Sequence, residues 1–337
     1  MKFAALALAV FALPFVAHAD PVADFYAGQT ITFHVGAGAG ATYALYAHLL
    51  ADHMPRHIPG QPTMIVNMAG GQSGGVIAAN YLHNAAPKNG LTIGMTQQTV
   101  IVDQVLRPQG KKFDVTKWNW IGLMAPVRNM LGVWHTAPAQ TLDEAKAKEV
   151  VVGSTGRASP TYMVPALLNK FVGTKFKIIT GYTGVADLDL AMERGEIQGR
   201  GGSWLSIPTG KPEWITDKKF KVLVIDALTK EPDLPGVPRM IDLPVNDRDR
   251  KVFALVSASA DFGRAVFAPP GVPAERVAAL RAAFDATMKD PAFLADAAKR
   301  LAAIETRPAV ELERMARDII ATPPDIVAAA REIMGAE

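Results

Sequence analysis

The sequence predicts an α/β protein of about two domains whose sheets are mostly parallel. Short β-branched runs alternate along the chain with longer helical patterns, which is the order of elements typical of parallel sheets. Residues 33–50 and 150–168 share one plan, namely a strand, a loop of glycine and small residues, Thr-Tyr, and a helix. The length of 337 residues fits about two domains. The shared plan puts one such loop in each expected domain.

The first nineteen residues have the pattern of a secretory signal peptide. Lys2 supplies a positive charge, residues 3–17 are almost continuously apolar, and Ala17-His18-Ala19 has the small-x-small form of a cleavage site. The apolar run is too short for a stable membrane span, and no later run reaches the required length. We therefore expect residues 1–19 to be removed and the mature protein to be exported to the periplasm, soluble and not lipidated.

Composition excludes several classes of site. The chain has no cysteine, so disulfides, lipidation at the mature N-terminus and thiolate metal sites are all unavailable. The formal net charge is +3 and no long basic run occurs, which argues against nucleic-acid binding. An exported protein without disulfides must be held together by its hydrophobic core, and this chain is long enough to build one.

Strands are expected where β-branched and aromatic residues run together between turn residues. The runs of this composition are 31–35, 63–68, 91–95, 149–153, 176–180, 220–227 and 264–270. After the first glycine loop, apolar residues from Ala41 to Leu49 recur with helical spacing, and Met54-Pro55 stops the pattern. The C-terminal segment from residue 272 carries mainly helical patterns.

The glycine loops GAGAGATY (36–43) and GSTGRAS (153–159) are candidate anion sites. Glycines let backbone N–H groups approach a ligand closely, and the helix that follows supplies unpaired donors and a partial positive charge. The simpler interpretation of one such loop is a tight turn from strand to helix. Two similar loops in one exported chain favour binding, and two loops that face each other across a cleft would clamp an anion.

A dinucleotide site is one alternative for the first loop. Gly36-x-Gly38-x-x-Ala41 satisfies the permissive form of the dinucleotide fingerprint, between a strand and a helix. The expected acid at the end of the second strand is absent, because residues 63–68 end in Asn67-Met68. No GKS or GKT follows either loop, so this alternative is weak.

A secreted serine hydrolase is the stronger alternative. The stretch Gly71–Gly75 matches the nucleophile pattern G-x-S-x-G with Ser73 at its centre. A catalytic triad requires a later histidine, and only His83 and His135 follow. His83 falls in the helix that begins after the turn, which is poor geometry, whereas Asp103 or Asp114 with His135 stays open.

An ordered set of motifs runs through the whole mature chain. It consists of the strand, glycine loop and threonine at 31–42, NMAGGQSGGVIAANYL (67–82), KNGLTIGM (88–95), GSTGRAS (153–159), GYTGVADLDLAMERGEIQ (181–198), and the series FKVLVIDALTKEPDLPGVPRMIDLP and VFAPPGVPAERVAALRAAF. In this set the chain resembles the Bug-type substrate-binding proteins of tripartite tricarboxylate transporters. Each motif alone is weak, but the ordered set is specific. The resemblance also explains Gly71–Gly75 as a glycine turn of the family.

The resemblance implies a two-lobed periplasmic binding protein, a Venus flytrap of type II-like form with two chain crossings between lobes. The implied first lobe comprises 20–125 and 237–337, and the second comprises 126–236. The implied function is a receptor, not an enzyme, that captures an organic carboxylate between its lobes and delivers it to membrane permease subunits. We expect the lobes to close about a hinge, the protein to be a monomer, and no cofactor, metal or nucleic acid to bind.

The candidate ligand-binding residues lie on the loops and at their edges. They are Gly38, Ala39, Gly40, Thr42, Tyr43, Ser73, Ser154, Thr155, Gly156, Arg157, Ser159, Tyr182, Ser203 and Trp204. Arg157 is expected to form a fork with a carboxylate, and the tyrosines and Trp204 to wall the cleft. Many relatives have Thr-Asp where this chain has Thr42-Tyr43, so the ligand can be a mono-, di- or tricarboxylate, including an aromatic acid.

Two polar groups are expected to have no site function. Pro55 interrupts the helix that would align His48, His53 and His57, so no metal site is predicted there. The acids at 187, 189, 193 and 196 are expected to face solvent around a helix.

Overall fold

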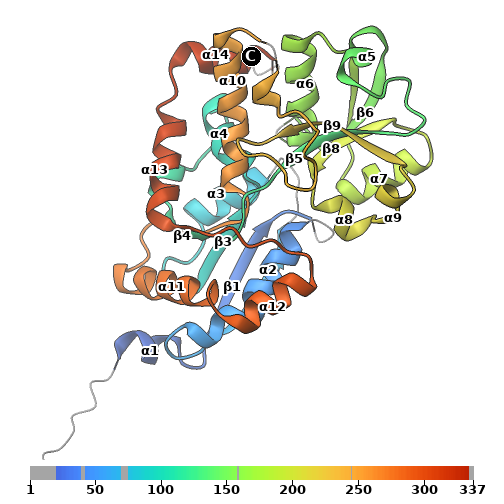
Figure 1. Ribbon diagram of the computed structural model, residues 1–337. Coiled ribbons are helices and arrows are strands. Elements are labelled where there is room, and N and C mark those ends of the chain that lie inside the picture. Colours follow the sequence, from blue (N-terminus) through green and yellow to red (C-terminus); the bar gives the residue numbers. More distant parts are fainter. Residues whose placement is uncertain (1–19, 39–41, 70–74, 158, 244, 334–337) are drawn as a thin grey trace, which may run out of the picture.

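The chain forms two mixed sheets, each covered by helices (Figure 1). The computed structural model describes residues 20–38, 42–69, 75–157, 159–243 and 245–333. The six-stranded sheet has the order β11-β4-β10-β3-β1-β2, with β1 Thr30–Gly36, β2 Thr63–Met68, β3 Thr92–Thr96, β4 Asn119–Leu123, β10 Ala265–Ala268 and β11 Arg307–Pro308. The five-stranded sheet has the order β7-β6-β8-β5-β9, with β5 Asn129–Trp134, β6 Val150–Ser154, β7 Phe176–Thr180, β8 Gly199–Ser203 and β9 Phe220–Asp226. We call the parts built on these sheets the first and second lobe.

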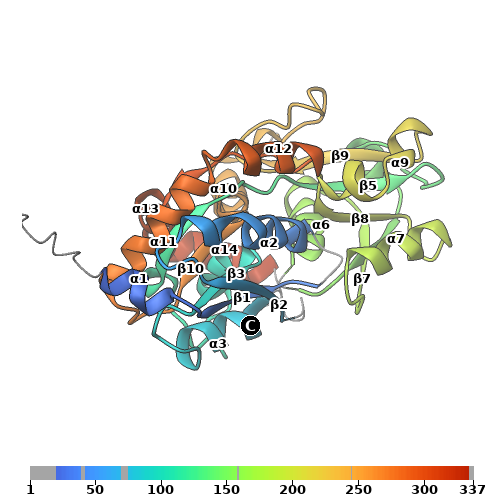
Figure 2. The same cartoon turned by 90° about the horizontal axis from the view of Figure 1, so that it is seen from below.

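Helices surround both sheets. On the first lobe they are α1 Pro21–Tyr26, α2 Thr42–His53, α3 Val76–Asn84, α4 Thr99–Leu106, α11 Ala274–Thr287, α12 Pro291–Lys299 and α13 Ala309–Ile320. The second lobe carries α5 Leu142–Ala147, α6 Pro160–Val172, α7 Val185–Glu193, α8 Ser206–Gly210 and α9 Glu213–Thr216, while α10 Asp247–Ala258 and α14 Pro324–Ile333 pack against α4 and α6 between the lobes. Figure 2 shows the two lobes side by side. Among the described helices, none has both the length and the apolar character that a bilayer crossing requires.

The expectation of mostly parallel sheets is wrong. Strand β1 pairs in parallel with β2 and β3, and β6 does so with β7 and β8. However, β10 runs antiparallel to β3 and β4, β11 is antiparallel to β4, and β5 is antiparallel to β8 and β9. The chain leaves the first lobe after β4 and later re-enters its sheet, and a returning strand need not follow the direction of the first.

Strand β8 shows why sequence patterns missed part of the sheet. Its sequence GRGGS has no β-branched residue. The backbones of the neighbouring elements lie so close to this strand that glycine is required. A Cβ atom on Gly199 would lie 2.6 Å from the carbonyl oxygen of Gly132 in β5. Close packing of strands therefore selects residues that β-propensity disfavours.

Two chain segments cross between the lobes and bind each other. The first follows β4, and the second follows α10 and leads into β10. The backbone N–H of Met124 donates to the carbonyl of Arg264 at 3.2 Å, and the N–H of Arg264 donates to the carbonyl of Ala125 at 2.9 Å. A Cβ on Gly263 would lie 2.2 Å from the carbonyl oxygen of Ala125, so only glycine fits this contact. The chain thus passes from the first sheet to the second between β4 and β5, and it leaves the second sheet after β9. The predicted lobe boundaries at 125 and 237 stay a prediction.

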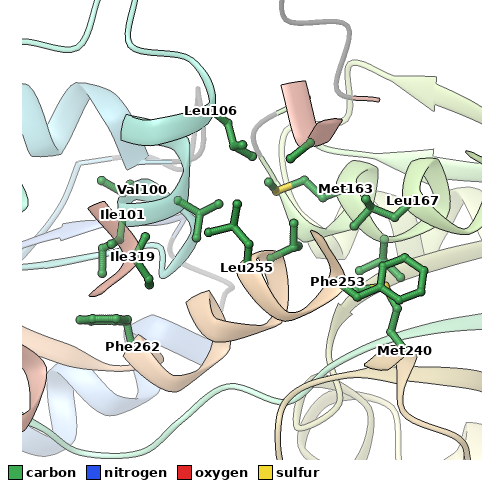
Figure 3. Close-up of a cluster of buried hydrophobic side chains, with 14 of the residues drawn as sticks. Val100, Ile101, Leu106, Met163, Leu167, Met240, Phe253, Leu255, Phe262 and Ile319 are labelled. Carbon is green, nitrogen blue, oxygen red and sulfur yellow. The ribbon is translucent and has the colours of Figure 1, made fainter. Parts of the chain in front are cut away.

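One hydrophobic cluster runs from the first sheet to the second (Figure 3). Val100 and Leu106 of α4 lie on one side, Met163 and Leu167 of α6 lie on the other, and α10 fills the space between them. Phe253 of α10 is fully buried. This cluster joins the lobes along one side and leaves their facing loops on another.

Candidate functional site

A cavity of about 280 Å³ lies between the two lobes. The first lobe contributes Gly38, Thr42 and Tyr43 from the first glycine loop and the start of α2. The second lobe contributes residues 159–161 and 183–187. Both predicted loops therefore reach one cavity, which has the interlobe position expected of a ligand site.

Three helices begin at this cavity. Residues at the starts of α2, α6 and α7 all belong to its lining. Helix α6 has Ser159 at its N-cap and Pro160 in its first turn, and α7 has Gly184 at its N-cap; neither N-cap residue makes a side-chain capping hydrogen bond. The first turn of a helix leaves backbone N–H groups unpaired and carries partial positive charge. The cavity is thus suited to an anion.

Arg264 lies behind the cavity wall and is only 1% exposed. Its Nη2 donates to Thr42 Oγ1 at 2.6 Å and to Ser203 Oγ at 3.4 Å, and both hydroxyl-bearing residues line the cavity. Its guanidinium also stands over the rings of Tyr43 and Tyr46, with its central carbon 5.1 Å and 4.9 Å from the ring centroids. Within the described part of the chain, no carboxylate forms an ion pair with it. Its positive charge is therefore not neutralised by a direct partner.

Tyr43 connects the first lobe to the second through two amides. Its hydroxyl donates to Gln98 Oε1, and the backbone N–H of Gln98 donates to the same hydroxyl oxygen at 3.1 Å. Gln98 Nε2 then donates to Asn129 Oδ1 at 3.2 Å, across the boundary between lobes. Burial raises the pKa of Tyr43, against the opposing effect of the Arg264 guanidinium, so its phenol stays protonated.

The second loop is held by a cluster of hydroxyls. Thr161 Oγ1 accepts from the backbone N–H of Thr155 at 3.0 Å and lies 3.0 Å from Ser154 Oγ, and it also contacts Ser159 Oγ. Thr155, Ser159 and Thr161 line the cavity, whereas Ser154 is fully buried beneath them. Local side-chain bonds of this kind fix the loop before any ligand arrives.

The structure brings six of the predicted site residues together at the cavity. They are Gly38, Thr42, Tyr43, Thr155, Ser159 and Ser203. Ala39, Gly40 and Ser73 lie outside the described residues. Ser154 and Gly156 support the second loop without lining the cavity.

The other three predicted site residues lie elsewhere. Arg157 is exposed, and its guanidinium stands over the Tyr162 ring at 5.7 Å. Trp204 is buried in a hydrophobic cluster of the second lobe, against which Tyr182 also packs. The aromatic wall expected from Tyr182 and Trp204 is therefore absent from the described lining, because both rings are used in packing.

Sequence reasoning missed Arg264, Gln98 and Asn129. Arg264 was assigned only to the strand run 264–270, since nothing marks a single arginine before apolar residues as a site. Gln98 and Asn129 are separated by thirty-one positions and meet only because the first crossing brings β5 beside α4. A polar residue at the edge of an apolar run was the one available signal.

The expectation that all four acids of 187–196 face solvent is wrong for two of them. Asp189 is 7% exposed, and its Oδ1 forms an ion pair with the fully buried Arg200 of β8. Asp187 is half-buried in the cavity lining, where its Oδ2 accepts from the backbone N–H of Thr183 at 3.3 Å and from the Thr183 hydroxyl. The physical reason is that α7 packs against β8, where a buried guanidinium needs a carboxylate.

Two of the three histidines named above, His53 and His57, contact carboxylates. His53 lies 3.1 Å from Asp296 and His57 lies 2.9 Å from Asp290, and the described residues contain no cluster of three or more side chains that could hold a metal. Trp118 Nε1 donates to His83 Nδ1 at 3.2 Å, so this ring nitrogen has a structural partner. Ser73 itself lies outside the described residues, so the hydrolase alternative stays a prediction.

Comparison with known proteins gives one family. Residues 47–329 match the family described as the tripartite tricarboxylate transporter family receptor. No curated protein matches this sequence.

Solved structures with a similar fold include the periplasmic binding protein BugD, with a TM-score of 0.70 and 19% identity over 93% of this chain and 99% of that one. An adipate-bound protein of R. palustris has a TM-score of 0.69 and 19% identity over 91% of this chain and 97% of that one. MatC from Rhodopseudomonas palustris with bound malate has a TM-score of 0.68 and 19% identity over 91% of this chain and 99% of that one. At these identities the likeness shows the two-lobed periplasmic binding protein fold.

Replacement of Asp189 tests the assignment of the buried ion pair. Asp189→Asn leaves the Arg200 charge buried without its carboxylate, so we expect a loss of about 3–5 kcal/mol in the free energy of unfolding. Asp187→Asn is the matched control on the same helix; it breaks no ion pair, so the expected loss is below about 1 kcal/mol. Denaturant titration of both variants measures the difference, and equal losses would contradict the assignment.

Proposed function

The chain belongs to the tripartite tricarboxylate transporter receptor family, and on that premise we propose that it is a periplasmic receptor for an organic carboxylate. It holds the solute between its lobes and delivers it to the membrane permease of a tripartite transporter. The family consists of solute-binding receptors, which supports a transport role without catalysis. The anion-suited cavity supports the carboxylate as the bound group.

The single observation that carries this proposal is the unpaired charge of Arg264. A guanidinium that is 1% exposed and lacks a described carboxylate partner is costly, because its hydration is lost without a counter-ion. A ligand carboxylate that binds at Thr42 and Ser203 supplies this negative charge at short range. The three helix starts add donors to the same anion. Asp187 is the one carboxylate in the described lining, and its Oδ2 already accepts from the backbone N–H and the hydroxyl of Thr183.

The cavity favours a small aliphatic acid. Its volume of about 280 Å³ lies just below the roughly 300–1,000 Å³ that ligand pockets span. Tyr43 is the one aromatic residue in the described lining, and its hydroxyl is already bonded to Gln98. Adipate and malate, bound by two proteins of similar fold, are acids of this size. We therefore place aliphatic mono- and dicarboxylates ahead of aromatic acids.

Closure about the crossing segments is part of the proposal. A ligand between two lobes must contact both, and its affinity for the closed form drives the motion. The hydrogen-bonded crossing segments and the cluster around α10 lie between the lobes and supply the fixed side of such a hinge. The closed, loaded receptor is the form that the permease is expected to bind.

A thermal-shift screen tests the ligand class. Malate and adipate are compared with their diamides and dimethyl esters at matched concentrations. An acid present at about a hundred times its dissociation constant raises the free energy of unfolding by roughly 2.7 kcal/mol. With about 2–4 °C per kcal/mol for a chain of this size, the unfolding midpoint should rise by several degrees. The neutral analogues should have little effect. A screen in which only neutral compounds stabilise the protein would refute the carboxylate proposal.

Replacement of Arg264 tests whether its unpaired charge contributes to ligand binding. Arg264→Gln keeps hydrogen-bond donors and removes the charge, so we expect affinity for a bound acid to fall roughly 10- to 100-fold. Arg264→Lys should retain more affinity than Arg264→Gln because it restores the charge. Arg157→Ala is the matched control, since the exposed Arg157 lies outside the described lining. Calorimetric titration with the acid found in the screen gives the affinities; an Arg157→Ala effect as large as that of Arg264→Gln would reject this role.

Uptake measurements test delivery. Deletion of the gene should abolish uptake of the acid that the purified protein binds, and the wild-type gene should restore it. The Arg264→Gln gene should restore it only at raised solute concentration, because capture is impaired while the docking surface is intact. Undiminished uptake in the deletion strain would separate the receptor from any transport role.

A further inference from the structure

Asp226 is a buried carboxylate whose hydrogen-bond partners in the described part of the chain are uncharged. It ends β9, directly opposite Asn129 in the antiparallel pairing with β5, and it is 1% exposed. Ser257 Oγ of α10 donates to its Oδ1 at 2.7 Å, and Asn129 Nδ2 donates to its Oδ2 at 3.3 Å. Among the described residues no charged side chain forms an ion pair with it, and Arg239, whose backbone bridges to Ile225, pairs with Asp242.

A hydrogen-bond chain links Asp226 to the cavity in one direction. Tyr43 donates to Gln98 Oε1, Gln98 Nε2 donates to Asn129 Oδ1, and Asn129 Nδ2 donates to Asp226. Each amide therefore accepts on the side of Tyr43 and donates on the side of Asp226. Arg264 stands over the ring at the far end of the chain, so the donors point from a buried positive charge toward a buried negative one. Tyr43, Gln98 and Asn129 line the cavity, whereas Asp226 does not.

The direction of the chain decides what the cavity offers a ligand. An amide can satisfy its neighbours in two orientations that exchange its oxygen and nitrogen. A carboxylate with no proton can only accept, so it forces the nitrogen of Asn129 toward itself and the oxygen toward Gln98. Gln98 must then donate to Asn129 and accept from Tyr43. In this arrangement each amide has one N–H outside the chain, and because both residues line the cavity this N–H can donate to a ligand carboxylate.

We propose that Asp226 is a positioning residue for ligand selection: as the terminal acceptor of the chain, it holds Gln98 and Asn129 in the orientation that discriminates carboxylates from amides. The ligand in this statement rests on the proposed function, whereas the orientation of the two amides does not. Loss of the acceptor frees Asn129 to turn, and the cavity then presents amide oxygen to a ligand carboxylate. Loss of the amide N–H contact and repulsion from the amide oxygen both weaken binding of the acid, whereas binding of the diamide is not weakened in this way.

The stability of the protein separates this role from a structural one. Burial raises the pKa of Asp226, against the opposing hydrogen bonds from Ser257 and Asn129. A raised pKa in the folded state means that folding stability falls as the pH rises through that pKa, because the folded state then holds a carboxylate that it disfavours. At neutral pH, Asp226→Asn removes this cost and should not lower the unfolding midpoint. A residue kept only to stabilise the fold would behave in the opposite way.

The test compares Asp226→Leu, Asp226→Asn and Ser257→Ala with the wild type. Affinities for malate or adipate, whichever binds, and for the matching diamide are measured by calorimetry. Asp226→Leu has no acceptor, so we expect its preference for acid over diamide to fall at least about tenfold. The amide of Asp226→Asn fits in two orientations, so this variant should lose part of the preference and lie between Asp226→Leu and the wild type. Ser257→Ala leaves the chain to the cavity intact and should keep the preference within about threefold of wild type. Equal loss of acid and diamide in Asp226→Leu, or a loss in Ser257→Ala as large as in Asp226→Leu, would overturn the proposal.

Side-chain amide NMR signals of ligand-free protein test the orientation without any ligand. The NH₂ signals of Gln98 and Asn129 should both shift in Asp226→Leu, and the Gln98 signal should stay in place in Ser257→Ala. In the wild type, the Asn129 signal should titrate with Asp226, and Ser257→Ala should raise the midpoint because its bond stabilises the charged form. Gln98 and Asn129 signals that stay in place in both Asp226→Leu and Asp226→Asn would refute the role, and Asp226→Asn keeps this test available if Asp226→Leu fails to fold. A positive NMR result without acid binding would instead reject the proposed function alone.

Discussion

The apolar contact of α10 with α4 and α6 is the constraint on which the arrangement of the two lobes depends. Phe253 and Leu255 of α10 pack between side chains of α4 and α6, and each such buried side chain contributes about 1.5–3 kcal/mol to stability. Because a packed interior resists gradual deformation, this contact fixes the distance between the sheets on one side. The crossing segments, hydrogen-bonded to each other at Arg264 and Ala125, add a second fixed line. The cavity occupies the space that remains between the facing loops.

Two equally buried arginines differ in whether a carboxylate neutralises their charge. Arg200 and Arg264 are both at most 1% exposed; Arg200 belongs to strand β8, and Arg264 contacts Ser203 at the end of that strand. Arg200 has Asp189 as its carboxylate and serves the packing of α7 on the sheet. Arg264 contacts only hydroxyls, a carbonyl and aromatic faces among the described residues, directly behind the cavity. Since a buried charge without a counter-ion is costly, its presence at a cavity is better explained by a ligand than by stability.

Much of the fold could be predicted from local patterns. The runs 31–35, 63–68 and 176–180 became β1, β2 and β7 with small shifts at most, and α2 ends where Met54-Pro55 interrupts its helical pattern. Strands β4, β5, β8 and β11 were not predicted. Strands β4 and β5 each have a single β-branched residue, β8 has none, and β11 is only two residues long. Sheet direction was mistaken for a different reason. Local composition marks a strand, whereas the return of the chain through β10 decides whether that strand pairs parallel or antiparallel.

The sequence by itself determined the export signal pattern, the absence of thiol chemistry, the two glycine loops and the family resemblance, because each depends on residues close together in the chain or on an ordered set of short motifs. It also predicted six residues that line the cavity, because glycine, serine and threonine at a helix start have a local chemical meaning. Only the tertiary structure decided which arginine lies behind the cavity and which amides reach it. Arg157 looked suitable by its place in a loop, yet Arg264, Gln98, Asn129 and Asp226 meet only where the chain crosses between lobes. Contacts between residues so distant in sequence depend on packing, and no local pattern encodes them.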